Sequence, residues 1–374
     1  MTSVNARAIS AAALDDAGRH AELDQGGMHD AIASFPSHLR ESISFASRID
    51  WTTAKPTTPA GICLCGMGGS AIGGDLARLY WAMQSPIPFV VHRGYRLPAH
   101  INDHWFVIAS SYSGNTEETL ASVAEARARG CRRILTISSG GSLARQSAEH
   151  SWPHILVPAG LMPRAALGYL FGSVLLTLAH WGVSGNDPRR LVAITETELR
   201  DAADLLDQRC RMLERSVSVA KNPAKRGALG VAGRVILVWG ATGSTDVIAA
   251  RLKSQLCENG KAMAFASPLP ELCHNEIVGL TEWGGAAESA AVIVLTSDDD
   301  DPGVAHQRAA VLDQLSARRI PVIHVAAVGN SRLVRMLSLV QFGDFLSYYV
   351  AIASGIDPTP IPAIDKLKQA LARS

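Results

Sequence analysis

Two short polar loops carry residues whose types and spacing suit the binding of an anion. The first is GMGGSAIGGD, Gly66 to Asp75, in which Gly68, Gly69 and Ser70 lie between an apolar strand and a helix. Glycines let backbone N–H groups approach a ligand, and a helix N-terminus adds partial positive charge. This turn therefore suits an anion or sugar hydroxyls, although a tight strand-to-helix turn without a ligand has the same pattern.

The second loop, SSYSGNTEET at Ser110 to Thr119, also lies between a predicted strand and a predicted helix. It places three hydroxyls and one amide at a helix N-terminus, where unpaired N–H groups also point; these residues are Ser111, Ser113, Asn115 and Thr116. A simple helix cap is the alternative, but a cap needs only one hydroxyl. Three hydroxyls favour a phosphate ligand.

The first turn also matches the GxGxxA dinucleotide fingerprint between Gly66 and Ala71. That fingerprint requires an acidic residue about twenty positions later, at the end of the next strand, to bind the ribose. Here the strand ends in Val-His-Arg. NAD is therefore disfavoured, while Arg93 leaves an NADP-dependent oxidoreductase open as an alternative.

The two loops, followed along the chain by ENGKAMAF and PELCHNEI, resemble the bifunctional phosphoglucose/phosphomannose isomerase family of sugar isomerase (SIS) domain proteins. The resemblance extends from LDQGGMHDAIASFP near Leu23 to DPTPIPAIDKLK, which ends at Lys368. Each loop alone is typical of any SIS domain, whereas the ordered set is specific to this family.

The resemblance implies a substrate site in the N-terminal half of the chain. It places the substrate phosphate among the three hydroxyls of the second loop, Ser111, Ser113 and Thr116. It places the sugar against the first turn, at Gly68, Gly69 and Ser70. The expected substrate is a hexose 6-phosphate, with glucose 6-phosphate and fructose 6-phosphate as the leading pair.

The resemblance also implies four catalytic residues. Glu258 in CENGK corresponds to the base, and His274 in PELCHNEI corresponds to the acid/base that opens the sugar ring. Arg164 in PRAALG would stabilise an enediolate, and Lys368 in IDKLK is a further active-site lysine. In this family the histidine comes from the other subunit, so a homodimer with shared active sites is expected.

The proposed chemistry suits these residue types. Aldose–ketose interconversion opens the ring and moves a proton between C1 and C2 through a cis-enediol, which one carboxylate can carry out on one face. A cation near O1 and O2 lowers the energy of the enediolate. This mechanism requires no cofactor and no metal.

Several alternatives remain open from the residues alone. Taken singly, Glu258, His274, Arg164 and Lys368 are each more typical of solvated or structural positions. A non-catalytic sugar-phosphate sensor would have the same two lobes, but we find no basic segment that could form a DNA-binding helix-turn-helix. Cys273 beside His274 could be a thiol nucleophile, although no second motif calls for acyl chemistry.

Two further patterns limit the possible activities. The twelve histidines are dispersed without HxH, HExxH or paired Cys/His spacing, which disfavours a zinc-dependent isomerase. Some dual-specificity members of the family have a Thr immediately before the proline that is Pro362 here. This chain has Ile361, which leaves acceptance of mannose 6-phosphate undecided.

The composition argues against polyanionic partners. Lys and Arg number 35 against 34 for Asp and Glu, and 47% of the 374 residues are hydrophobic. A net charge of +1 provides no global field for nucleic acid or an anionic membrane. The six cysteines form no CxxC pair, and the N-terminus lacks the apolar core of a secretory signal, so a cytosolic protein is expected.

The elements that must position these residues alternate between strands and helices, which predicts an α/β fold. In the first half we expect strands at Gly61–Cys65, Pro88–His92, Trp105–Ser110, Arg133–Ser138 and His154–Pro158. Helices are expected between them at Ile72–Met83, Glu117–Arg129 and Leu143–Ala148. The apolar stretch Leu170–Val183 is too short to span a bilayer and predicts a buried helix.

The second half repeats this plan. We expect strands at Val235–Trp239, Ala291–Thr296 and Pro321–Ala326, with helices at Asp246–Asn259 and Val304–Arg318. An internal duplication is therefore predicted, with two doubly wound parallel-sheet lobes of flavodoxin-like type. In the second lobe the TSDDDD loop, Thr296 to Asp301, would repel a phosphate, so only the first lobe is expected to bind an anion.

The predicted domains are an N-terminal lobe at 1–160, a helical bridge at 161–230, a second lobe at 231–330 and C-terminal helices at 331–374. The bridge consists of helical segments from Arg164 to Val219 and a polar tract at Lys221–Gly230. The C-terminal helices are expected at Ser331–Ala353 and Ile364–Ala372.

Overall fold

The computed structural model describes residues 10–51, 58–182, 187–282, 289–318 and 320–371. The chain divides into two compact units. The five-stranded unit comprises Ser34–Asp207 and Gly329–Val334, and the four-stranded unit comprises Met1–Ala33, Gln208–Val328 and Arg335–Ser374. The four linear domains expected from the sequence stay a prediction, and each compact unit is described by itself.

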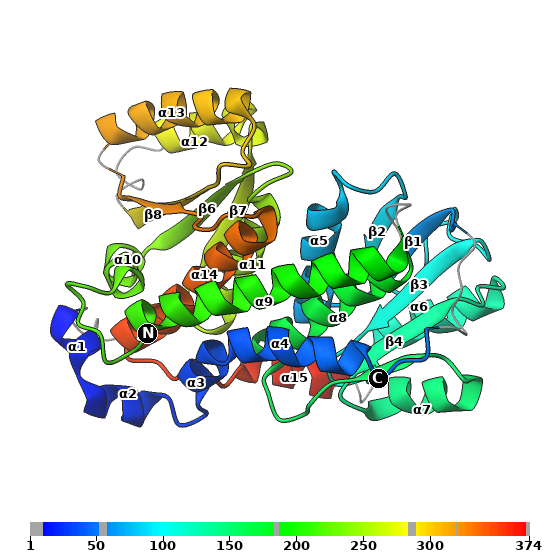
Figure 1. Cartoon of the computed structure of the whole chain (residues 1–374). Coiled ribbons are helices and arrows are strands. Elements are labelled where there is room, and N and C mark those ends of the chain that lie inside the picture. The colour runs from blue at the N-terminus through cyan, green and yellow to red at the C-terminus, as the bar shows by residue number, and fades with distance from the viewer. Residues whose placement is uncertain (1–9, 52–57, 183–186, 283–288, 319, 372–374) are drawn as a thin grey trace. The chain divides into compact units, whose positions relative to one another are not determined.

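The five-stranded unit contains one parallel sheet of order β2-β1-β3-β4-β5 (Figure 1). Its strands are β1 (Gly61–Cys65), β2 (Phe89–His92), β3 (Trp105–Ser110), β4 (Ile134–Ser138) and β5 (His154–Leu156). All neighbouring strands pair in parallel. The expected five-stranded doubly wound lobe is confirmed, and the bounds of β1 and β3 agree with those read from the sequence.

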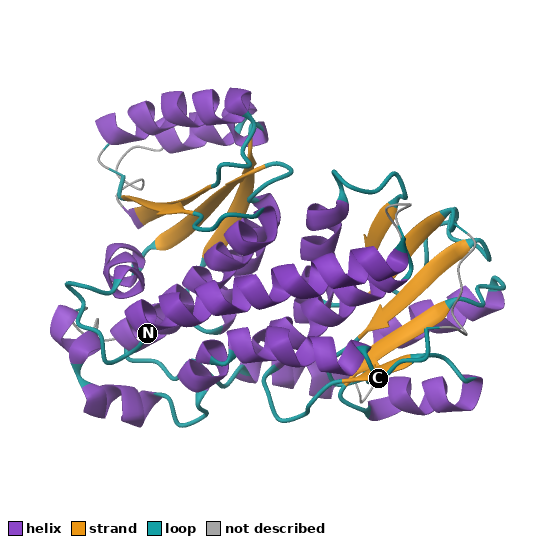
Figure 2. Ribbon diagram, in the orientation of Figure 1, coloured by secondary structure: helices purple, strands orange, loops and turns teal. Residues whose placement is uncertain are grey.

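Helices cover both faces of this sheet (Figure 2). They are α4 (Phe35–Ala46), α5 (Gly68–Trp81), α6 (Glu117–Ala128), α7 (Gly141–His150) and α8 (Leu167–His180), with the first part of α9 (Pro188–Leu213). On one face Cys63 and Cys65 pack in a cluster with Ala126 of α6. On the other face the side chain of Leu64 packs against Gly74 of α5. A Cβ at Gly74 would lie 2.8 Å from Cδ2 of Leu64. Both faces are thus apolar, as a doubly wound parallel sheet requires.

The four-stranded unit contains a parallel sheet of order β7-β6-β8-β9. Its strands are β6 (Val235–Ala241), β7 (Ala264–Leu269), β8 (Ala290–Thr296) and β9 (Val322–Ala326). This order repeats the order β2-β1-β3-β4 of the other sheet, which supports the predicted internal duplication. The sequence analysis missed β7.

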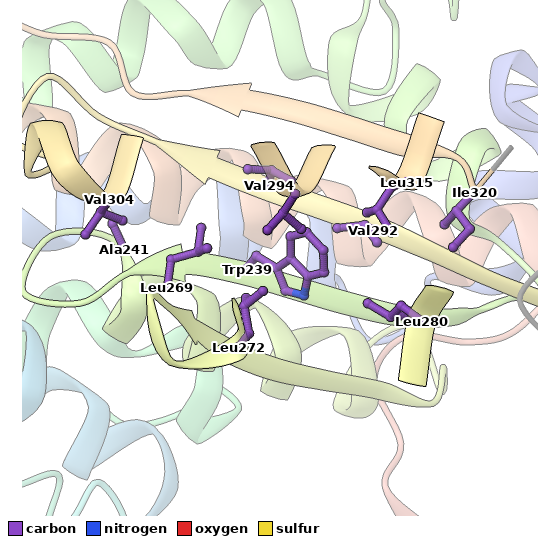
Figure 3. Packing of buried hydrophobic residues seen from close by; sticks show 11 residues of the cluster. Trp239, Ala241, Leu269, Leu272, Leu280, Val292, Val294, Val304, Leu315 and Ile320 are labelled. Atoms are coloured by element: carbon purple, nitrogen blue, oxygen red, sulfur yellow. The ribbon is translucent and has the colours of Figure 1, made fainter. Parts of the chain in front are cut away.

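On one face of this sheet a core gathers around Trp239 of β6 (Figure 3). The unit also contains nine described helices. They are α1 (Ala11–Asp15), α2 (Ala17–Leu23), α3 (Met28–Ala33), α10 (Pro223–Val231), α11 (Asp246–Glu258), α12 (Glu276–Glu282), α13 (Pro302–Ala317), α14 (Arg332–Ser354) and α15 (Pro362–Leu371). Leu280 of α12 and Leu315 of α13 belong to the Trp239 cluster. Burial of such side chains contributes about 1.5–3 kcal/mol each to folding.

One expectation about the middle of the chain differs from the structure. The tract Lys221–Gly230 was expected to be a polar connection, but Pro223–Val231 forms α10. Lys225 is buried there because its Nζ donates to Asp15 Oδ1 and to the carbonyl oxygen of Arg215, at 2.9 and 2.8 Å. Lys225 is thus a buried anchor between α10 and the N-terminal segment.

The apolar helices lie in the interior. The predicted buried helix is confirmed as α8, in which every residue from Leu167 to Ala179 is buried; Val183, its expected end, lies outside the described residues, as does Ala372. Among the described residues α14 has the length and mean hydropathy of a membrane span, and its apolar window is completely buried in the protein. We interpret α14 as a core helix.

Two histidines make the five-stranded unit sensitive to acid. Burial lowers the pKa of His38 and of His180 to about 4. Because the unfolded chain binds these protons at a higher pH, the associated stability is present above about pH 6.5 and is lost as the pH falls toward 4. For each histidine, the free energy of unfolding should fall by about 1 kcal/mol when the pH is lowered from about 7.5 to about 5.5.

We therefore expect His38→Leu to reduce the loss of stability of the five-stranded unit over this pH interval by about 1 kcal/mol. Urea unfolding at the two pH values measures this difference. His104→Leu, at an exposed histidine of the same unit, is the matched control variant. An identical pH dependence in wild type and His38→Leu would contradict the interpretation.

Candidate active site

The loop between β3 and α6 holds its hydroxyl groups in one small network. Ser111 is 2% exposed, and its Oγ accepts the N–H of Gly114 at 3.1 Å. The same Oγ shares a hydrogen bond of 2.8 Å with Thr116 Oγ1. Thr116 is the N-cap of α6, yet its side chain makes no capping bond. The Thr116 hydroxyl therefore does not act as a helix cap.

A neighbouring loop fixes the shape of the hydroxyl loop. A Cβ at Gly114, whose φ is +70°, would lie 1.9 Å from the carbonyl oxygen of Gly140 in the β4–α7 connection. The N–H of Ser142 donates to Asn115 Oδ1 at 2.9 Å, and the N–H of Leu143 donates to the carbonyl oxygen of Gly114 at the same distance. The role of this β4–α7 connection was not predicted from the sequence, although its SSGGS segment follows a strand as the first glycine turn does.

The glycine turn at the start of α5 lies beside the same loop. Ser70 Oγ accepts the N–H of Tyr112 at 3.3 Å. Gly68 has a φ of +51° and no atom within 4 Å of the place where a Cβ would be. Gly68 therefore leaves open space at the helix N-terminus, where backbone N–H groups suit an anion.

Arg164 belongs to this part of the five-stranded unit. It is 3% exposed and lies in the 3-10 helix η1 (Pro163–Ala165). A Cβ at Gly69 would lie 2.9 Å from the carbonyl oxygen of Pro163 and 3.5 Å from Cα of Arg164. The structure thus places Arg164 beside the predicted glycine turn. Arg164 is buried, whereas an arginine considered alone was expected at the surface.

Tyr112 connects the hydroxyl loop to the segment that leads to Arg164. Its hydroxyl donates to the carbonyl oxygen of Pro158 and accepts the N–H of Leu161, both at 2.9 Å. Burial raises the pKa of Tyr112, so the hydroxyl keeps its proton. The sequence does not indicate this role, because the partners of the Tyr112 hydroxyl lie more than forty positions along the chain.

Arg93, the residue that kept an NADP-dependent activity open as an alternative, has an acidic partner within the protein. The Arg93 guanidinium forms an ion pair with the carboxylate of Asp75 on α5. A 2′-phosphate would have to compete with this carboxylate for Arg93. The pairing therefore weighs against the dinucleotide alternative.

In the four-stranded unit, Glu258 is the last residue of α11 and is half-buried. One face of α11 is fixed to α14 by polar side chains at four-residue spacing. Arg251 Nη2 lies 2.7 Å from Asp344 Oδ2, Gln255 Nε2 donates to Asp344 Oδ1 at 2.9 Å, and Asn259 Nδ2 donates to Ser347 Oγ at 3.0 Å. This row holds the end of the helix that carries Glu258.

The chain after Glu258 is also anchored. Lys261 Nζ donates to the backbone carbonyl oxygens of Glu258 and Pro358, both at 2.8 Å. A Cβ at Gly260 would meet the carbonyl oxygen of Leu256 at 2.8 Å, so this position needs a glycine. The CENGK motif therefore contains structural residues around the expected base.

The remaining predicted residues of this unit are exposed. His274 ends the 3-10 helix η2 (Glu271–His274), and Lys368 lies on α15, which has no buried residue. Burial raises the pKa of Cys273, which disfavours the thiolate that a nucleophile would need. Whether Glu258, His274 and Lys368 converge with the loops of the five-stranded unit stays a prediction.

The acidic loop of the second sheet is less repulsive than its sequence suggests. Asp299 pairs with Arg335 at 2.6 Å, and Asp300 pairs with Arg308 at 2.5 Å. Two of the four carboxylates that were expected to repel a phosphate are thus neutralised inside the unit. The partner of Asp299 could not be foreseen locally because Arg335 follows it by thirty-six positions.

Comparison with known proteins identifies the chain. Residues 220–371 match the family described as bacterial phospho-glucose isomerase C-terminal SIS domain. A bifunctional phosphoglucose/phosphomannose isomerase from Caldicellulosiruptor bescii is 35% identical over 92% of this chain and 99% of that protein. The chain belongs to the bifunctional phosphoglucose/phosphomannose isomerase family. Another relative with that name, from Aquifex aeolicus, is 32% identical over 88% of this chain and 96% of that protein.

A solved structure supports the fold. The C-terminal domain of glucosamine-fructose-6-phosphate aminotransferase from Francisella tularensis superposes with a TM-score of 0.70 and 16% identity. The match covers 89% of this chain and 98% of that one. The resemblance to the isomerase family and the two-lobe SIS fold expected from the sequence are both confirmed.

The contacts of Tyr112 generate a direct test. Tyr112→Phe removes the hydroxyl that joins Pro158 to Leu161, so we expect about 1 kcal/mol lower stability. We also expect faster amide hydrogen exchange in residues 158–164 than in wild type, while β1 and β3 remain protected. Tyr95→Phe is a matched control, because Tyr95 is exposed and belongs to the same unit. Unchanged exchange in residues 158–164 would show that this hydroxyl does not hold the Arg164 segment.

Proposed function

We propose that this chain interconverts glucose 6-phosphate and fructose 6-phosphate, with mannose 6-phosphate as a further aldose substrate. The observation that carries the proposal is the 35% identity over 99% of an isomerase of this name. The hydroxyl loop supports it locally, because the Thr116 side chain is not used to cap α6. The proposed enzyme uses neither a metal ion nor a redox cofactor.

The phosphate of the substrate would bind at the hydroxyl loop. Ser111, Ser113 and Thr116 supply hydroxyl donors, and the N-terminus of α6 supplies backbone N–H groups. Ser113 is exposed and Ser111 is buried in the loop network, so Ser113 is available to a ligand without any rearrangement. The sugar would lie toward Gly68, Gly69 and Ser70.

Glu258 is the proposed base for proton transfer. Its carboxylate removes the proton from C2 of the open-chain aldose, the C–H electron pair forms the C1–C2 double bond, and the C1 carbonyl oxygen gains a proton. In the second half O2 loses its proton as the C2 carbonyl forms, and Glu258 returns its proton to C1. Atoms and electrons balance without an external oxidant. Arg164 would stabilise negative charge on the enediolate oxygens.

His274 and Lys368 are the proposed groups for ring opening. Ring opening requires a proton at the ring oxygen and removal of the proton from the C1 hydroxyl. Imidazole can perform either step near neutral pH. Lys368 would supply a second cation near the sugar hydroxyls.

Replacement of the proposed base tests the mechanism. We expect Glu258→Gln to lower kcat by about a thousandfold, because the amide cannot accept the C2 proton. Fructose 6-phosphate should still bind, since this change leaves the hydroxyl loop intact. An enzyme-coupled assay measures turnover, and calorimetry measures binding.

The matched control is Glu22→Gln, an exposed glutamate of α2 in the same unit. It should retain wild-type turnover. If wild type binds sugar phosphates but isomerises none of them, the alternative of a non-catalytic regulatory protein replaces the proposal. If Glu258→Gln remains fully active, the base is another residue.

We also propose that the enzyme is a cytoplasmic homodimer in which His274 serves the active site of the partner subunit. The exposure of His274 on η2 supports a role outside its own unit. Each active site would then combine Glu258 of one subunit with the histidine of the other.

Mixed dimers distinguish shared from separate active sites. Glu258→Gln and His274→Ala should each be nearly inactive alone. After joint refolding in equal amounts, roughly a quarter of the wild-type activity should return, because each mixed dimer has one intact site. No recovery from proteins that demonstrably exchange subunits would place both residues in one subunit's site.

A further inference from the structure

The five-stranded unit contains a cavity at the amino ends of its strands. It has a volume of about 620 Å³ and is bordered by Phe106 near the start of β3, Ile134 at the start of β4 and Pro153 just before β5. The hydroxyl loop instead follows the carboxyl end of β3. The six residues of β3 separate the two places by about 20 Å. This cavity is therefore not part of the candidate active site.

The lining of the cavity is strongly cationic. Arg127, Arg132 and Arg133 contribute three guanidinium groups, and His150 adds an imidazole. The residues that line the cavity include no aspartate or glutamate. Within the described part of the chain, neither Arg127 nor Arg132 has a carboxylate in salt-bridge distance. Glu149 Oε1 lies 4.0 Å from Nε2 of His150, so the three arginines supply the positive charge of this hollow.

Aromatic rings lie among these guanidinium groups. The Arg127 guanidinium carbon is 5.8 Å from the ring centroid of Trp152, and the His150 ring is 4.9 Å from the same tryptophan. The Arg133 guanidinium lies 5.1 Å from the Phe106 ring. Cation–π contacts of this kind keep the guanidinium groups near the rings. A ligand would therefore meet aromatic faces and guanidinium donors together.

We propose that this cavity binds a nucleoside phosphate. Guanidinium groups bind phosphate oxygens through paired N–H donors. The half-buried Trp152 and the Arg127 guanidinium that lies over its ring offer planar surfaces on which a base can stack. The volume lies within the usual range for small-molecule sites. A second hexose phosphate fits less well, because Ser151 is the one hydroxyl-bearing residue in the lining.

The ends of two helices connect this cavity to the active-site loops. α6 begins after Thr116 in the hydroxyl loop, and Arg127 lies in its last turn. α7 begins at Gly141, which contacts Ser113, and ends at His150. The nucleotide site is thus distinct from the sugar site but is built on the same two helices.

Binding experiments on the full-length chain test this proposal. Calorimetry with ADP, and separately with adenosine and inorganic phosphate, compares the nucleotide with its two parts. We expect saturable binding of ADP that is at least about tenfold tighter than that of either part, because both recognition elements contribute. Saturating fructose 6-phosphate should not displace ADP. Equal binding of phosphate and ADP would overturn base recognition and leave only an anion site.

Matched double variants locate the site. Arg127→Gln with Arg132→Gln should weaken ADP binding by about tenfold or more, and Trp152→Leu should weaken ADP but not phosphate. Arg189→Gln with Arg190→Gln removes the same charge from exposed positions of α9 in the same unit and should leave binding unchanged. Thermal unfolding of each variant verifies that it folds. Absence of ADP binding, equal weakening by both double variants, or displacement by fructose 6-phosphate would each overturn the proposal.

Discussion

The candidate site of the five-stranded unit depends on backbone segments that approach more closely than a Cβ atom permits. At Gly69 the carbonyl oxygen of Pro163 occupies the space that a side chain would need, and at Gly114 the carbonyl oxygen of Gly140 does so. These contacts join the glycine turn to the Arg164 segment and the hydroxyl loop to the β4–α7 connection. The positions of the hydroxyls therefore follow from main-chain packing, which rotamer changes cannot alter.

The four-stranded unit positions Glu258 in a different way. The buried pair of Arg251 and Asp344 has lost its hydration, and burial raises the pKa of Asp344 while the arginine opposes that shift. Buried pairs of this kind contribute little net stability but define one arrangement, because a misplaced partner would leave a charge unpaired. Gln255 and Asn259 extend the same row along α11. The end of α11 is thereby held in one orientation against α14.

The sequence predicted what is encoded locally. β1 and β3 are short apolar runs between loops, and their bounds were correct. β7 was missed because AFASPL includes Pro268 and exposes Phe265, as edge strands can. Partners distant in the sequence were also missed. Tyr112 contacts Leu161, and Lys225 binds Asp15 across 210 positions, and no local pattern specifies either pair.

The two units are interleaved along the chain. The four-stranded unit takes its first helices from residues before 34, and the five-stranded unit includes Gly329–Val334, while α9 and α14 each contribute residues to both. No single cut in the polypeptide would release either lobe with all of its own packing partners. Although the two sheets repeat one strand order, neither lobe therefore corresponds to a contiguous stretch of sequence that could be excised as a module.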